Sequence, residues 1–240
     1  MSRPLLRRLV AVAGAAATAL LLAAAPAAAQ PGRAPEARLA SRLDAATLRQ
    51  VMAQVDSARQ DGLPFEKLVD RALEGASKRA PGARIAAAVR ELRLALGEAR
   101  VALGRDASAV ELEAGASAIQ ARVAPRVLAG LRRARPDGSL TVPLAVLTDL
   151  VAYGVPVDTA ARTVLALARA EDAALVAFQH EVERDISVGA VPATAASLRA
   201  GPIVRTLESA TAPGLYSGNA GAANDTRSNS ANRPPVLRKP

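Results

Sequence analysis

Signals that end one helix and start the next recur along this chain, and they constrain its fold more than any other feature. At four junctions a small or apolar pair precedes a proline. Glycine favours the left-handed backbone of a helix end, and proline suits the first helical turn, where its missing N–H has no intrahelical acceptor. The four junctions are Gly62-Leu63-Pro64, Val123-Ala124-Pro125, Gly154-Val155-Pro156 and Ala190-Val191-Pro192.

The segments between these junctions carry apolar residues at helical spacing. In the segment before the first junction, apolar residues stand at positions 48, 51, 52, 55 and 58, which form one face of an amphipathic helix. Asp44 is placed to cap this helix, and Ser108 with Glu111 forms a capping-box pattern before another. The segment from Val142 to Tyr153 is apolar on nearly all sides and is expected at the centre of the core. No segment alternates as a strand would, so the sequence predicts an all-α fold of about nine helices.

The junctions also suggest an internal repeat. Successive junction prolines lie 61, 31 and 36 residues apart, close to multiples of one unit of about 30–36 residues. Helix-turn-helix pairs of this length bury their apolar faces by stacking on their neighbours. The residues inside the units match one another poorly, however. Two interpretations therefore stay open: a short α-solenoid-like array of stacked helix pairs, or a plain helical bundle.

The first 29 residues have the pattern of a signal peptide. Arg3, Arg7 and Arg8 form a positive start, and the 17 residues Leu9–Ala25 are uncharged and rich in Leu and Ala. Ala27-Ala28-Ala29 offers the small residues that signal peptidase recognises. The apolar run is shorter than the ~20 residues of a spanning helix. We expect cleavage after Ala29 and a periplasmic or secreted protein of bacterial type that is not an integral membrane protein, with the Sec and twin-arginine routes both open.

The remaining chain divides into three parts. Residues 30–43 are rich in Pro, Ala and Arg and lack periodicity, which predicts a flexible leader. Residues 44–208 form the expected all-helical domain. Residues 209–240 are dominated by Gly, Asn, Ser, Ala and Pro and cannot bury enough apolar surface to offset their ordering entropy, which predicts a disordered tail.

Residues suited to catalysis or metal binding are scarce. The chain has no Cys, one His and 2% aromatic residues, so thiolate metal sites, Cys nucleophiles and disulfides are excluded. His180-Glu181 begins a zinc-like pattern, but Arg184 stands where a second ligand would be needed. No phosphate-binding loop and no nucleophile elbow occurs. We expect a protein that is not an enzyme and that uses no cofactor and no metal.

An arginine cluster is the strongest candidate site. Five arginines fall in one short window that contains no acidic residue, and the chain without its signal peptide keeps a net charge of +6. A concentrated positive face attracts anionic partners. Nucleic acid is not expected, because no aromatic residue lies among the arginines to stack on bases and the export signal separates the chain from it. The candidate anion-binding residues are Arg122, Arg126, Arg132, Arg133 and Arg135.

Two functional hypotheses follow. The first is an exported, non-enzymatic helical protein with an interaction or scaffolding role in the cell envelope, where it contacts a protein partner. The alternative is an electrostatic binder of anionic envelope polymers or lipids, which would use the Arg-rich face. Protein binding through an apolar groove would resist salt, whereas polyanion binding would weaken with salt.

Overall fold

The computed structural model of the protein describes residues 35–211. Within this range the regular structure consists of ten α-helices, and no residue lies in a strand. The predicted all-α fold is therefore confirmed. The helices are α1 (Pro35–Ala40), α2 (Ala45–Gln60), α3 (Glu66–Ser77), α4 (Gly82–Leu103), α5 (Ala109–Gln120), α6 (Pro125–Ala134), α7 (Thr141–Ala152), α8 (Val157–Ala166), α9 (Asp172–Ser187) and α10 (Pro192–Thr211).

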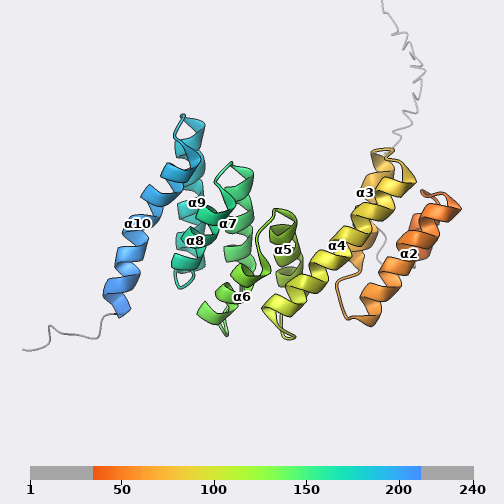
Figure 1. Cartoon of the computed structure of the whole chain (residues 1–240), viewed down its shortest axis with the longest axis horizontal. Helices are drawn as coiled ribbons and strands as arrows, with labels where there is room; N and C mark the ends of the chain where they lie inside the picture. The colour runs from red at the N-terminus through yellow and green to blue at the C-terminus, as the bar shows by residue number, and fades with distance from the viewer. Residues whose placement is uncertain (1–34, 212–240) are drawn as a thin grey trace, which may run out of the picture.

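The helices stack along one direction in two layers. Every closely packed pair of helices is either consecutive in the chain or separated by a single helix. The even-numbered helices from α2 to α10 each pack against the next even-numbered one, and α5, α7 and α9 do the same in the other layer. As a result, α2 and α10 lie at opposite ends of the molecule (Figure 1). The fold is an open array of stacked helix pairs and not a closed bundle, in which the first and last helices would meet.

The same turn ends α2, α3, α5, α7 and α9. In each case one residue has a φ between 54° and 100°, and the N–H of the next residue donates to the carbonyl five residues earlier at 2.8–3.0 Å. This is the Schellman motif, which satisfies carbonyl groups that the end of a helix leaves free. A proline follows within three residues and starts the next helix. The left-handed residues are Gly62, Arg79, Arg122, Gly154 and Gly189.

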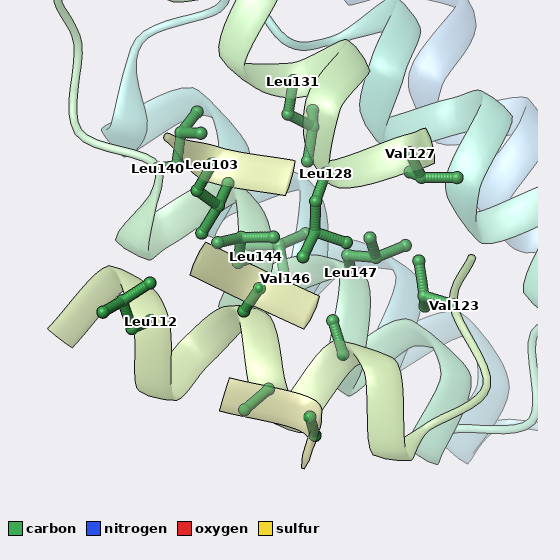
Figure 2. Close-up of a cluster of buried hydrophobic side chains, with 14 of the residues drawn as sticks. Leu103, Leu112, Val123, Val127, Leu128, Leu131, Leu140, Leu144, Val146 and Leu147 are labelled. Atoms are coloured by element: carbon green, nitrogen blue, oxygen red, sulfur yellow. The ribbon is translucent and has the colours of Figure 1, made fainter. Parts of the chain in front are cut away.

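The apolar core runs along the array between the two layers. Its middle is built by α4, α5, α6 and α7, whose leucine and valine side chains meet in Figure 2. The helix predicted at the centre of the core, α7, packs against α5, α8 and α9. Gly115 lets α5 approach α4 closely, because a Cβ at this position would lie 3.0 Å from the Cβ of Ala99. Each fully buried leucine contributes about 1.5–3 kcal/mol, so these contacts hold successive pairs together.

The start of the helical domain differs from the expectation. Residues 35–40 of the predicted flexible leader form α1. Leu39 is fully buried, and Arg38 donates to Glu66 at 2.7 Å and to Asp70 at 3.1 Å on α3. One buried leucine and these two ion pairs attach the segment to the array. Residue periodicity over so short a stretch could not indicate this attachment. The prediction of a flexible leader was wrong for residues 35–40.

The end of the domain also differs. Helix α10 continues past Pro202 to Thr211, beyond the boundary expected at residue 208. Ile203, Val204 and Leu207 pack against the core and support the helix after the proline. The predicted signal peptide (residues 1–29), residues 30–34 of the leader and residues 212–240 of the predicted tail lie outside the described residues. Between Pro35 and Thr211, no helix combines the length and the apolar character that crossing a membrane requires.

The recurring turn makes a prediction about glycine. Gly154 has φ of +90°, and the nearest atom to a Cβ there would be 3.7 Å away, so backbone strain and not crowding opposes a side chain. Gly154→Ala should lower the free energy of unfolding by about 1–2 kcal/mol in urea denaturation. Gly97→Ala is the matched control, because Gly97 lies inside α4 with open space around it and should gain up to about 1 kcal/mol. Changes of the same sign at both positions would contradict the turn assignment.

Candidate functional site

Arg132 lies at the centre of a hydrogen-bond network at the end of α6. Its Nη2 donates to Oε1 of Glu111 at 2.7 Å, and its Nη1 donates to the carbonyls of Arg135, Pro136 and Gly138 at 3.0–3.3 Å. The side chain is 23% exposed. Arg132 therefore ties the loop after α6 to the beginning of α5.

Glu111 is the buried acceptor of this network. Its Oε2 accepts the N–H of Ser108 in the predicted capping box, and its Oε1 accepts the N–H of Leu140 at 2.8 Å as well as the bond from Arg132. Burial on its own would raise the pKa of this carboxyl. The hydrogen bonds from Ser108, Leu140 and Arg132 outweigh it and hold the pKa of Glu111 below its usual value. One ionised carboxylate thus joins α5, α6 and the start of α7.

Arg135 connects the next two loops. Its guanidinium donates to the carbonyls of Ala168 and Ala170, which lie between α8 and α9. It also pairs with Asp172 at 2.6 Å, at the first position of α9. The side chain is 14% exposed. Arg135 therefore joins the α6–α7 loop to the α8–α9 loop, and its hydrogen-bonding groups point into the protein.

The five arginines of the predicted cluster do not form one face. Arg132 and Arg135 are engaged inside the protein, because each closes a junction between helix pairs. Arg122 occupies the left-handed position after α5 and lines a hollow of about 550 Å³ together with Arg71, Glu91 and Glu98. Two acidic residues in the same hollow balance these two arginines. Only Arg126 and Arg133 remain together on a free surface.

Arg126 and Arg133 lie on the outer side of α6. They are seven residues apart, which places them two turns apart on the same helix face. Both are exposed, and neither forms an ion pair with any residue between positions 35 and 211. The buried residues of α6, which include Leu128 and Leu131, lie on the opposite side.

The structure places further arginines beside this pair. Arg162 on α8 and Arg169 in the turn after α8 are exposed and repeat the spacing of seven residues, each 36 residues after its counterpart on α6. Arg205 on α10 is exposed and follows Arg169 by another 36. A window confined to one stretch of sequence could not find this set. The repeated spacing of 36, which matches the last interval between junction prolines, is the signal that could have. We call Arg126, Arg133, Arg162, Arg169 and Arg205 the arginine lattice.

A second surface feature is an apolar groove at the end of the array. It encloses about 600 Å³ between α9 and α10. Its floor includes Phe178, which is 2% exposed, and its edge includes Leu198, which is 68% exposed. His180 on α9 is exposed, and residues 35–211 contain no group of His, Asp and Glu suited to hold a metal ion. The groove is lined by Ala174, Ala177, Phe178, Glu181, Leu198, Arg199, Pro202 and Ile203.

Comparison of the chain with protein-family models, with curated proteins and with solved structures gives no match.

The Glu111 network predicts a charge-dependent stability. Glu111→Gln should lower the free energy of unfolding at pH 7 by about 3 kcal/mol, because it leaves Arg132 without its buried charge partner. Since folding lowers the pKa of Glu111, its contribution is complete above the pKa of the unfolded chain and is lost as pH falls through the folded pKa. The difference between the two proteins should therefore be constant near neutral pH and shrink below about pH 4.

Urea denaturation between pH 3 and pH 7 measures this difference. Glu98→Gln is the matched control, because Glu98 is exposed on α4 and should change stability by less than about 0.5 kcal/mol. A Glu111→Gln protein as stable as the control variant would show that the network does not join the helix pairs.

Proposed function

We propose that this is an exported, non-enzymatic interaction or scaffolding protein of the cell envelope. The signal-peptide pattern of residues 1–29 supports the proposed export. The interaction role is supported by an array that is open along its length between residues 35 and 211. Arrays of this kind bind partners on extended surfaces.

The single observation that carries the proposal is the apolar groove at the α10 end. On α9, Gln179 faces α7 and donates to Asp149 at 2.9 Å. Ala177 lies two residues away, on the other side of the helix, and lines the groove. The groove therefore occupies the place where a further helix would continue the stack of α5, α7 and α9. This continuity supports a helix of a partner protein as the occupant, one that presents an apolar stripe at i, i+3, i+4 and i+7.

The proposal predicts salt-resistant binding that depends on the groove. Purified Gln30–Pro240 should pellet with envelope fractions at low and at high salt, and protease treatment of the fractions should abolish this. Ala177→Glu should prevent pelleting, because Ala177 is exposed and a charged side chain there would fill an apolar site. Ala152→Glu is the control, because Ala152 is exposed on α7 outside the groove.

Pelleting that is unchanged in Ala177→Glu would contradict the groove as the binding site. Pelleting that survives protease treatment would contradict a protein partner. Both outcomes are read at high salt, where weak electrostatic attraction to the fractions is screened.

A further inference from the structure

We propose that the arginine lattice binds the anionic head groups of a phospholipid surface. This inference goes beyond the proposed protein interaction and rests on a neighbouring surface of the molecule. It concerns the outer side of α6, α8 and α10, whereas the groove lies between α9 and α10, and Leu198 borders both. The residues involved are Arg126 and Arg133 on α6, Arg162 on α8, Arg169 in the turn after α8, and Arg205 on α10.

The packing of the even-numbered helices sets the register of the lattice. A Cβ on Gly130 of α6 would lie 3.0 Å from Cδ2 of Leu165 on α8, so residues about 35 apart are level across these helices. A Cβ on Gly154, just before α8, would lie 3.7 Å from Cγ of Pro192, the first residue of α10. These contacts join residues 35 and 38 apart, so residues separated by 36 lie near one another on neighbouring helices. Arg126 and Arg133 are about 10 Å apart along α6, and neighbouring helices are roughly 8–10 Å apart.

The lattice arginines are available to a ligand. None of them forms an ion pair with a residue of the described range, in contrast to Arg132, Arg135 and Arg199, which do. Arg162 donates only to the carbonyl of Asp158 in its own helix. Four exposed acidic residues lie within four positions of a lattice arginine: Asp137, Asp158, Glu171 and Glu208. Five positive and four negative charges leave an excess of one.

A lipid surface fits this face better than a linear polyanion does. The arginines form two rows that cross neighbouring helices, so the charge is spread over a plane. The position 36 residues after Arg162 is Leu198, a large apolar side chain that is 68% exposed. An exposed leucine beside arginines suits the boundary between head groups and acyl chains, where the charged groups meet phosphate and the leucine inserts. A polyanion in water would gain nothing from the leucine.

The test is vesicle sedimentation with Gln30–Pro240. Each positive charge near an anionic bilayer strengthens binding about five-fold, so an excess of one predicts binding about five-fold tighter to phosphatidylglycerol-containing vesicles than to pure phosphatidylcholine. Changing all five lattice arginines to Gln should remove this difference. The control changes Arg42, Arg49, Arg84, Arg90 and Arg105 to Gln, which are equally exposed, form no ion pair within residues 35–211, and alter the net charge by the same amount.

The control variant should keep most of the preference for anionic vesicles, and Leu198→Ser should weaken binding without changing its salt dependence. Equal loss in the lattice and control variants would overturn the proposal, because net charge alone would then explain binding. Binding to heparin without binding to vesicles would overturn it in favour of a polyanion. Ala177→Glu should bind vesicles as the unaltered chain does, so failure of the groove and failure of the lattice are separable.

Discussion

The left-handed turn that ends α2, α3, α5, α7 and α9 is the constraint on which the rest of the structure depends. It closes the end of one helix with a hydrogen bond from the residue after the left-handed position, and proline then starts the next helix. Because the same turn is used each time, each pair has its second helix on the same side. The even-numbered helices therefore form one layer, and their outer faces become a single surface.

Arginine has three different roles in this molecule, and only its surroundings distinguish them. Arg79 and Arg122 take the left-handed position that glycine holds in the other turns. Arg132 and Arg135 close the junctions between successive pairs, where their guanidinium groups satisfy loop carbonyls and carboxylates. The lattice arginines make no such contacts and are left for a partner. Net charge alone therefore says little about which arginines bind anything.

Much of the fold could be predicted from the sequence, because its determinants are local. The junction prolines, the capping box at Ser108 and the apolar face of α2 depend on residues a few positions apart. The helix α1 could not be predicted, since its tertiary contacts, through the buried Leu39 and through Arg38 to α3, explain it. For the same reason, the sequence could not show which arginines share a surface. Arg132 and Arg135 find their partners 21 and 37 residues away, at Glu111 and Asp172, and the lattice joins arginines 36 residues apart.

The open array is the central claim, and a distance between its two ends tests it most directly. The chain contains no cysteine, so Ala53→Cys on α2 and Ser197→Cys on α10 would place spin labels at two exposed positions without background. Four helix-to-helix steps of about 8–10 Å separate these helices in the even-numbered layer, so the array predicts a label distance of roughly 32–40 Å or more by pulsed electron paramagnetic resonance. A distance near 20 Å, as neighbouring helices of a closed bundle would give, would contradict it.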